Sequence, residues 1–290
     1  MDLEQKSIER LKLASEMSLK YYKQPLIITT SGGKDSDICL HLAKASGIPY
    51  EVQHNLTTAD APQTIYHVRD QFRRLELEGV KCTVNLPYYK GVRTSMWALI
   101  PQKLMPPTRL ARYCCQVLKE GGGKGRMITT GVRWAESNAR KERGLYETVV
   151  VKKANRIILN NDNDDKRLLF ENCKLQAKRV CNPIIDWKDQ DVWGYIQGEG
   201  IDINPLYQCG FSRVGCIGCP MASNARYTEF RLFPKYKQLY INAFDRMLDA
   251  RRAKGLPTTW QSGEEVMHWW LDDGVLPGQM EMEMEDTTND

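Results

Sequence analysis

The octapeptide TSGGKDSD, at residues 30–37, is the feature that most limits how this chain of 290 residues can fold. It follows the apolar run PLIITT (25–30), which predicts a buried strand, and it precedes ICLHLAKA (38–45), whose apolar spacing predicts a helix. Ser36 is the expected N-cap of that helix. Two adjacent glycines let a backbone approach a phosphate closely, and Lys34 adds a positive charge. A strand, a phosphate-binding turn and a helix therefore begin an α/β domain.

Beyond this loop, short apolar runs alternate with helical patterns up to about residue 135. Strands that alternate with helices favour right-handed crossovers, and hence an α/β fold with a doubly wound, mostly parallel sheet and helices on both faces. ETVVVKK and NRIILN are candidates for a hairpin, and NNDNDDK (160–166) is expected to be a polar loop. The further predicted strands are PYEVQHNL (49–56), KCTVNLP (81–87) and RMITTGV (126–132), and the further predicted helices are 61–77, 94–104 and 110–120.

The C-terminal third has a different pattern. A strand end and a helix are expected in NPIIDWKDQDVWGYIQ (182–197), then a group of cysteines, then one long helix over 223–254. That helix either covers the sheet or presents a basic surface to a nucleic acid, because its basic residues outnumber its acidic ones. The expected domains are an N-terminal helix (1–20), an α/β domain (21–220) with the cysteine cluster at 209–219, a helical extension (221–280) and an acidic tail (281–290).

Composition narrows the setting of the protein. With 42% hydrophobic residues, 27% charged residues and a net charge of +5, the chain resembles ordinary soluble globular proteins. No apolar run reaches the length of a membrane span, and the first helix is charged and amphipathic, unlike a signal peptide. We therefore expect a cytoplasmic location and no membrane partner. Nine cysteines in that compartment favour metal binding or redox chemistry over structural disulfides.

The polar residues of the loop suggest specific roles. Ser31 and Ser36 can donate hydroxyl groups to phosphates, and Gly32 and Gly33 permit close approach of the backbone. Asp35 could hold Mg²⁺ or orient the neighbouring lysine.

SGGKDS after a buried first strand resembles the PP-loop of the ATP pyrophosphatase superfamily, also called adenine nucleotide α-hydrolases. RYCCQVLKE (112–120), GVRWAESNAR (131–140) and the segment from 182 to 219 resemble the phosphoadenosine phosphosulfate reductase family. The likeness covers roughly residues 20–230. It implies an adenine nucleotide α-hydrolase-like fold, with ATP phosphates in the loop and attack at the α-phosphate.

The same resemblance implies that Gly131 and Arg133 lie beside the loop, and that Arg133 and Arg140 contact phosphate or sulfonate groups. The alternative for Arg133 is a surface ion pair with Glu136.

Five cysteines are candidate metal ligands. Cys209, Cys216 and Cys219 lie within eleven residues, with glycines between them, and a fourth thiolate can come from the adjacent pair Cys114 and Cys115. Zinc and a [4Fe–4S] cluster both accept four thiolates. The resemblance favours the cluster, bound by the adjacent pair with Cys216 and Cys219. A set made of Cys209, Cys216, Cys219 and one member of the pair is equally defensible. The remaining cysteines, at 39, 82, 173 and 181, are expected to be small buried hydrophobes.

Two departures from the reductase pattern shape the functional hypotheses. Reductases of the family carry a nucleophilic cysteine in a C-terminal tail, whereas this sequence has none after Cys219. Their loops also usually depart from the full SGGKDS, which is intact here. The first hypothesis is therefore an ATP-dependent, iron–sulfur-dependent sulfurtransferase that binds ATP and Mg²⁺ through Ser31 to Ser36, with Lys34, Asp35 and Arg133 as catalytic residues.

Two other hypotheses remain open. One is a sulfonucleotide reductase with a relocated catalytic thiol, and the other is a non-catalytic nucleotide-binding regulator. The expected partners are an adenine nucleotide, a sulfur donor or thiol reductant, and a nucleic acid as one candidate acceptor. A homo-oligomer is left open.

Overall fold

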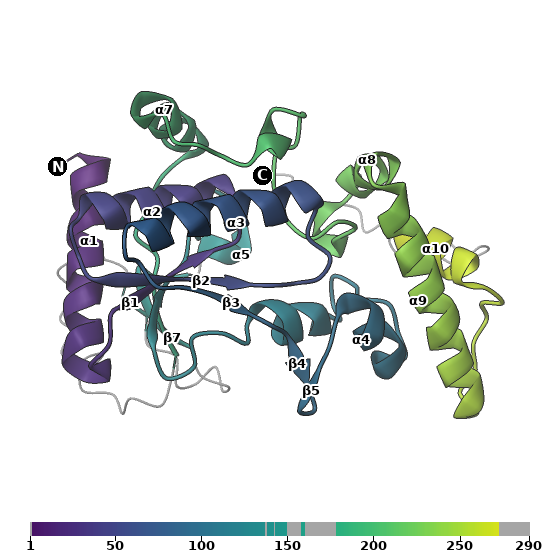
Figure 1. The fold of residues 1–290 in the computed structure, drawn as a ribbon. Helices are drawn as coiled ribbons and strands as arrows, with labels where there is room; N and C mark the ends of the chain where they lie inside the picture. Colours follow the sequence, from purple (N-terminus) through teal and green to yellow (C-terminus); the bar gives the residue numbers. More distant parts are fainter. Residues whose placement is uncertain (1, 137, 142, 150–157, 160–177, 273–290) are drawn as a thin grey trace, which may run out of the picture. The chain divides into compact units, whose positions relative to one another are not determined.

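The computed structural model describes residues 2–136, 138–141, 143–149, 158–159 and 178–272 (Figure 1). By their internal contacts, the residues divide into two compact units, and neither unit is one continuous stretch of chain. The first, here named the sheet unit, comprises Met1–Leu56, Asp60–Pro87 and Leu118–Gly215. The second, here named the cysteine unit, comprises Thr57–Ala59, Tyr88–Val117 and Cys216–Asp290.

In the part of the chain that the structure describes, the sheet unit is built around a sheet of seven strands. Neighbouring strands from β3 to β9 are parallel, whereas β7 is antiparallel to both β9 and β8. The mostly parallel sheet expected from the sequence is confirmed. In spatial order the strands are β3 (Cys82–Asn85), β2 (Tyr50–Asn55), β1 (Leu26–Thr30), β6 (Met127–Thr129), β9 (Lys178–Cys181), β7 (Tyr146–Val149) and β8 (Ile158–Leu159).

Strand β1 is the point at which the chain order reverses. It pairs with β2 on one side and with β6 on the other, both in parallel. In open α/β sheets, ligands bind at the carboxyl ends of the strands that flank such a reversal. The residues that follow Thr30 therefore begin at the position where this architecture places a ligand.

Helices surround the sheet of the sheet unit. Figure 1 shows α2 and α3 running across one face of β1, β2 and β3. Apolar side chains of three helices (Leu11, Ile38 and Val68) and of two strands (Ile28 and Val52) form one buried core. The helices are α1 (Leu3–Met17, followed by a π-helical turn at Ser18–Tyr22), α2 (Lys34–Ala45), α3 (Pro62–Leu77), α5 (Asn138–Lys141) and α7 (Asp189–Glu199), with single 3₁₀ turns at Trp134–Glu136 and Pro205–Tyr207.

The cysteine unit is mainly helical. An aromatic cluster forms its core, in which the ring of Trp270 lies 4.7 Å from that of Tyr240 and 5.4 Å from that of Phe244, between centroids. Its elements are α4 (Met96–Lys103), α8 (Ala225–Leu232), α9 (Pro234–Ala253), α10 (Gly263–Leu271), a 3₁₀ turn at Pro220–Ala222 and the two-stranded sheet of β4 (Tyr88–Tyr89) and β5 (Val92–Arg93). A π-helical segment, Cys115–Lys119, includes the boundary between the two units.

Most elements predicted from the sequence are present, and three of these predictions need correction. The strand end expected in 182–197 lies just before that segment, because β9 ends at Cys181. The helix expected over 223–254 is two helices, because Pro234 cannot continue α8 and instead begins α9. The helix expected over 110–120 is confined to the short stretch from Tyr113 to Lys119. The expected hairpin is confirmed in its described part by the antiparallel pair β7 and β8. The predicted loop at 160–166 and the acidic tail lie outside the described residues.

The division into units differs from the linear order of domains expected from the sequence, which stays a prediction. The cysteine unit takes in residues 88–117 as well as the chain from Cys216 onward. Among the described residues, no helix is both long enough and apolar enough to cross a membrane.

Candidate functional site

The loop between β1 and α2 has a backbone that only glycine allows at one position. Gly32 has a φ of +72°, and a Cβ there would lie 2.9 Å from the Thr64 Cγ2 atom of α3. Both the conformation and the close approach therefore exclude a side chain. The Gly32 carbonyl accepts a hydrogen bond of 3.0 Å from Asn204 Nδ2, so the turn is also held from outside the loop.

Ser36 braces the loop from within and does not cap the helix, so the predicted N-cap is wrong. The N-cap residue is Gly33, because α2 already begins at Lys34. The Ser36 hydroxyl donates to the Gly33 carbonyl at 2.7 Å and accepts from the Ser31 amide at 3.2 Å. A helix that begins this early brings its positive N-terminus directly to the glycines.

Charged groups at the start of α2 form a connected set within the sheet unit. The Lys34 Nζ atom lies 3.2 Å from Asp35 Oδ2, and Arg133 Nε donates to Asp35 Oδ1 at 2.6 Å. Arg133 is only 1% exposed, and its other donors reach Asp189 Oδ1 at 2.8 Å and the Trp187 carbonyl at 3.3 Å. Arg133 thus orients Asp35, and it forms no ion pair with Glu136, which accepts from the Arg133 backbone amide.

The other two residues implied by the resemblance also lie near the loop. A Cβ at Gly131 would come within 2.8 Å of the Asp35 backbone, so this glycine lets the two segments touch. Arg140 forms an ion pair with Glu136. Burial lowers the pKa of Arg140, Asp35 opposes that change, and the charges of Arg143, Arg213 and Arg133 add to it. Crowded guanidinium groups beside a phosphate loop are suited to holding an anion.

Two aromatic residues near Lys34 were missed by sequence reasoning. The Lys34 ammonium lies 5.8 Å from the Trp193 ring centroid and 5.6 Å from that of Tyr207. The Tyr207 hydroxyl accepts a hydrogen bond of 3.0 Å from the Lys34 amide, and burial raises the pKa of Tyr207 to about 12. No local sequence motif predicts the contact between Tyr207 and Lys34, which depends on the position of the 3₁₀ turn against the loop.

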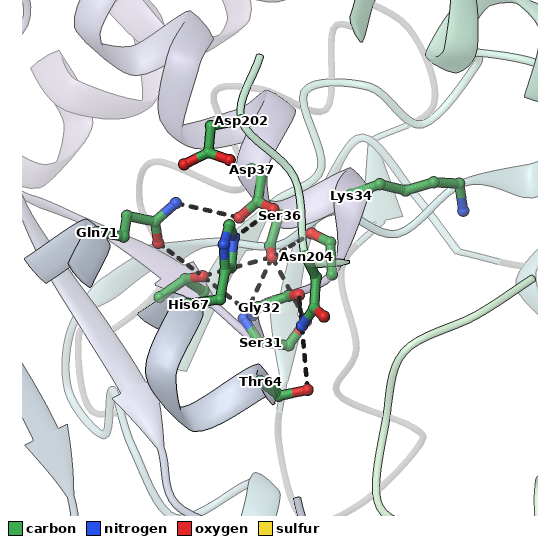
Figure 2. Close-up of polar contacts among 12 residues, drawn as sticks. Ser31, Gly32, Lys34, Ser36, Asp37, Thr64, His67, Gln71, Asp202 and Asn204 are labelled. Atoms are coloured by element: carbon green, nitrogen blue, oxygen red, sulfur yellow. Dashed lines mark hydrogen bonds and ion pairs between the residues drawn. The ribbon is translucent and has the colours of Figure 1, made fainter. Parts of the chain in front are cut away.

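A buried polar group beside the loop was also missed. Asp37, on the first turns of α2, is bonded to two residues of α3, His67 at 3.0 Å and Gln71 at 3.1 Å. Figure 2 shows these side chains converging, while Lys34 points away from them. The spacing of Thr64, His67 and Gln71 along α3 places them on one helix face, which was a signal available in the sequence.

Four of the five candidate metal ligands belong to the cysteine unit: Cys114, Cys115, Cys216 and Cys219. The pKa of the Cys114 thiol is raised by its hydrogen bond with Cys115, then by burial and by the charges of Cys115, Cys216 and Cys219. The four sulfurs are therefore close enough to interact electrostatically. As they stand, no group of three Cys, His, Asp or Glu side chains among the described residues could hold a metal ion.

Cys209 lies apart from this set in the division of the chain. It belongs to the sheet unit and is exposed, next to the 3₁₀ turn that carries Tyr207. Cys39 and Cys181 are fully buried, as expected, whereas Cys82 is half-buried and its pKa is raised by burial to about 11. Cys173 lies outside the described residues. None of the eight described cysteines forms a disulfide.

Comparison with known proteins places the chain in a family. The sequence profile of the phosphoadenosine phosphosulfate reductase domain matches residues 25–222, more than half of the 290 residues. The chain belongs to this family. The matched residues of this chain include the SGGKDS loop, Arg133 and all five candidate cysteine ligands.

Three of the proteins that the chain resembles share no more than 28% sequence identity with it. An uncharacterized protein of Methanocaldococcus jannaschii is 28% identical over 258 residues, which cover 87% of this chain and 54% of that protein. The adenosine 5'-phosphosulfate reductase of Bacillus cereus is 21% identical over 217 residues, or 72% of this chain and 78% of the enzyme. The phosphoadenylyl-sulfate reductase of Candida auris, solved as a phosphate complex, aligns with a TM-score of 0.45 and 18% identity, covering 72% of this chain and 87% of that one.

Several of the curated proteins that the chain matches are longer than it is. The chain spans about half the length of the curated relatives it matches first, with 54% of one M. jannaschii protein, 41% of a second and 44% of a protein of Escherichia phage 186.

Proposed function

We propose that this member of the family binds ATP at the SGGKDS loop, releases pyrophosphate and adenylylates an acceptor for sulfur transfer. The observation that carries this function is the arrangement of Lys34, Asp35 and Arg133 at the start of α2. Cleavage next to the α-phosphate requires that the charge of the leaving pyrophosphate be held. Lys34 provides a positive charge on a flexible stem, and Asp35 provides a carboxylate whose orientation Arg133 fixes.

In this mechanism the loop amides and the N-terminus of α2 bind the β- and γ-phosphates. Lys34 exchanges its ion pair with Asp35 for the phosphate oxygens. The acceptor oxygen attacks the α-phosphorus, the bond from phosphorus to the bridging oxygen breaks, and pyrophosphate leaves with both bonding electrons. A sulfur nucleophile then displaces AMP from the adenylylated acceptor. Arg140, in its group of crowded guanidinium ions, is the candidate partner of the α-phosphate.

The donor atoms at the loop fit Mg²⁺. The Asp35 carboxylate supplies hard oxygen ligands. Lys34 Nζ contacts only its Oδ2 atom, at 3.2 Å, so this oxygen becomes available once Lys34 binds phosphate instead. Mg²⁺ usually takes one or two carboxylates and completes its coordination with phosphate oxygens and water. When bound, the ion would neutralise the charge that develops on pyrophosphate.

The cysteine unit carries four of the thiols that a group bound by thiolates would need. Cys114, Cys115, Cys216 and Cys219 are the proposed ligands of a [4Fe–4S] cluster, with zinc as the alternative occupant. The positive charge of a bound metal would lower the pKa of the Cys114 thiol, which the other three cysteines raise without it. When bound, the cluster would supply a site for the sulfur that is transferred.

The test is an assay for pyrophosphate and AMP with protein purified without oxygen. ATP, Mg²⁺ and sulfide are supplied, with bulk tRNA or duplex DNA as the trial acceptor, and iron and acid-labile sulfide are measured on the same sample. We expect stoichiometric pyrophosphate and AMP that depend on the acceptor. A protein that binds no ATP would contradict the function. Turnover would exclude a non-catalytic regulator.

A sulfonucleotide reductase is the second candidate, and the exposure of Cys209 in the sheet unit favours it. In that reaction the Cys209 thiolate attacks the sulfur of phosphoadenosine phosphosulfate, the nucleotide phosphate leaves, and a second thiol reduces the thiosulfonate and releases sulfite. Sulfite release with dithiothreitol as reductant separates the two functions. If Cys209→Ser leaves the release of sulfite intact, a relocated thiol at this position is excluded.

The acceptor is unassigned, and the C-terminal helices inform one candidate. Of the basic residues expected to form a nucleic-acid surface, Arg226 is buried and binds the Trp270 and Leu271 carbonyls. Arg251 binds the Leu104 and Pro257 carbonyls. The exposed remainder is Arg231, Lys235, Lys237, Arg246, Arg252 and Lys254. A nucleic-acid acceptor on this surface stays a proposal, tested by whether bulk tRNA or DNA supports pyrophosphate release.

A further inference from the structure

Helix α3 turns a polar face toward the loop where an apolar face would be expected. Thr64, His67 and Gln71 follow one another at spacings of three and four residues, which places them on one side of the helix. They are 0%, 7% and 8% exposed, and each is hydrogen-bonded on its buried side (Figure 2). Buried polar groups of this kind are costly unless they are paired, so their partners show what they do.

Gln71 connects the buried carboxylate of α2 to the backbone of the loop. Its Nε2 donates to Asp37 Oδ1 at 3.1 Å, and its Oε1 accepts from the Thr30 hydroxyl at 3.3 Å. The single hydroxyl proton of Thr30 is therefore directed at Gln71. The Thr30 Oγ1 atom keeps a lone pair that accepts a hydrogen bond of 3.2 Å from the Gly32 amide. Each bond in this series fixes the direction of the next.

His67 occupies the other oxygen of the Asp37 carboxylate. Its Nε2 lies 3.0 Å from Asp37 Oδ2, and Asp37 is 2% exposed. Two further charged groups act on the imidazole, Asp202 and Arg74, and these bind each other at 2.8 Å. Burial and Arg74 lower the pKa of His67, but the hydrogen bond and charge of Asp37 and the charge of Asp202 outweigh them, so the pKa is raised overall.

The opposite side of the Gly32 peptide is held by the same helix. Asn204 is fully buried, and its Nδ2 donates to both the Gly32 carbonyl and the Thr64 hydroxyl, each at 3.0 Å. Gly32 is thus bonded at its N–H through Thr30 and at its C=O through Asn204. A polar residue of α3 stands behind each bond, Gln71 on the first side and Thr64 on the second.

We propose that His67 is a positioning residue of the phosphate loop, which acts through Asp37, Gln71 and Thr30 to hold the Gly32 peptide in its binding conformation. His67 need not touch a nucleotide, because the Lys34 side chain points away from the group around Asp37 (Figure 2). The consequence for ATP binding rests on the proposed function, whereas the ordering of the loop does not.

A positioning role for His67 has a pH dependence with a definite sign. Because the folded-state pKa of His67 is raised, the stabilisation it provides is complete below the ordinary value of 6.5. That stabilisation is lost as the pH rises through the raised value. Burial raises the pKa of Asp37, whereas its hydrogen bonds with His67 and Gln71 and the charge of His67 oppose that rise. The loop should be best ordered at the acid side of neutrality.

The deciding experiment is amide hydrogen exchange of the peptide that carries residues 30–36, corrected for intrinsic rates, from about pH 6 to about pH 9. Wild type is compared with His67→Phe, which removes the donor, and with His67→Gln, which keeps a donor that does not titrate. The matched control is His41→Gln, since His41 is a partly exposed histidine of α2 that faces Glu199 at 3.7 Å.

We expect the loop of His67→Phe to exchange about tenfold faster than wild type or more, because a buried charged hydrogen bond is lost. His67→Gln should retain partial protection that no longer varies with pH, and the control should match wild type. Equal loop exchange in wild type and His67→Phe would overturn the proposal. If His67→Phe exchanges globally because it is unfolded, His67→Gln decides by whether its pH dependence persists.

Binding of Mg²⁺-ATP to the same variants separates this inference from the proposed function. We expect His67→Phe to bind about tenfold more weakly, with a smaller change in turnover at saturation. Wild type that binds no ATP would end the proposed function, and loop exchange would still decide the role of His67. If ATP binds and neither affinity nor loop exchange responds to His67→Phe, the positioning role is wrong and the proposed function stands.

Discussion

The sheet unit carries the phosphate loop, and the cysteine unit carries four candidate metal ligands. The two units differ in whether the polypeptide alone orders these residues. In the sheet unit, bonds from Thr30, Ser36 and Asn204 already hold the loop. In the cysteine unit, the charges of three other cysteines help to raise the pKa of Cys114. The described side chains nevertheless include no group of three Cys, His, Asp or Glu residues that could hold a metal ion as they stand. We therefore expect folding to order the loop, and a bound metal group to draw the four sulfurs into their final geometry.

Removing the lysine of the loop is expected to have the largest effect. Lys34→Ala should lower ATP-dependent pyrophosphate release at least about a hundredfold, because the charge that meets the leaving pyrophosphate is gone. The matched control is Lys44→Ala on the same helix, where the lysine is exposed and pairs with Glu78 at 2.6 Å. Initial rates of pyrophosphate release measure both variants. If the two lose activity equally, the loop is no more important than the rest of α2.

Replacing single cysteines tests the other side of the comparison. Cys114→Ser and Cys219→Ser, in the cysteine unit, should each lose most of the bound iron and lower the unfolding temperature. Cys209→Ser, in the sheet unit, should keep its iron. Iron and sulfide analysis with visible absorption reports the outcome. Iron lost from Cys209→Ser and retained by Cys114→Ser would instead favour the alternative ligand set that includes Cys209.

The sequence predicts the fold of the sheet unit well, because its signals are local. PLIITT is apolar at successive positions, as a strand buried on both faces must be, and it forms β1. The glycine pair next to Lys34 marks the turn, since Gly32 needs a positive φ. The start of α2 was misjudged because Ser36 fits an N-cap equally well by type, and only the bond from Ser36 to Gly33 shows that it lies inside the helix.

Contacts between distant segments could not be read from the sequence. Arg133 was expected at a phosphate, but its burial against Asp35 and Asp189 depends on how β6 and α7 meet around it. Tyr207 is not part of any motif, and its position at the Lys34 amide depends on the 3₁₀ turn that carries it. His67 reads as an ordinary residue of an amphipathic helix until Asp37 is seen opposite it.

Breaking the contact between Arg133 and Asp35 should test how strongly the sheet unit is organised around its loop. Arg133→Met is expected to destabilise the protein by about 3–5 kcal/mol, because it leaves a partly buried carboxylate with fewer partners. The control, Asp189→Asn, removes the other ion pair of the same arginine. The Asp189 side chain is 73% exposed, so its loss should cost less than about 1 kcal/mol. Urea unfolding near neutral pH gives both values, and equal losses would mean that the inner ion pair has no special weight.

Behind Arg133 stands a second ion pair, which anchors α1 to the segment that holds the arginine. Asp186 precedes Trp187, whose carbonyl accepts from Arg133. The Asp186 carboxylate receives both Nη atoms of Arg10, at 2.7 and 3.0 Å, and Lys6 Nζ at 2.8 Å. Burial works to raise the pKa of Asp186, but the hydrogen bonds and charges of Arg10 and Lys6 prevail and lower it from 3.8 to about 2.

Replacing Asp186 should destabilise the protein less than replacing Arg133, and the pH dependence of the effect can be tested in acid. A lowered folded-state pKa means that the stabilisation is complete above 3.8 and is lost as the pH falls through about 2. Asp186→Asn should therefore lower the free energy of unfolding by about 2 kcal/mol near neutral pH, and its deficit relative to wild type should shrink between pH 3.8 and 2. Urea unfolding across that range measures the difference. A deficit that stays constant with pH would show that the carboxylate charge does not stabilise the frame behind the loop. The pre-ordering attributed to the sheet unit would then depend on its buried hydrogen bonds alone.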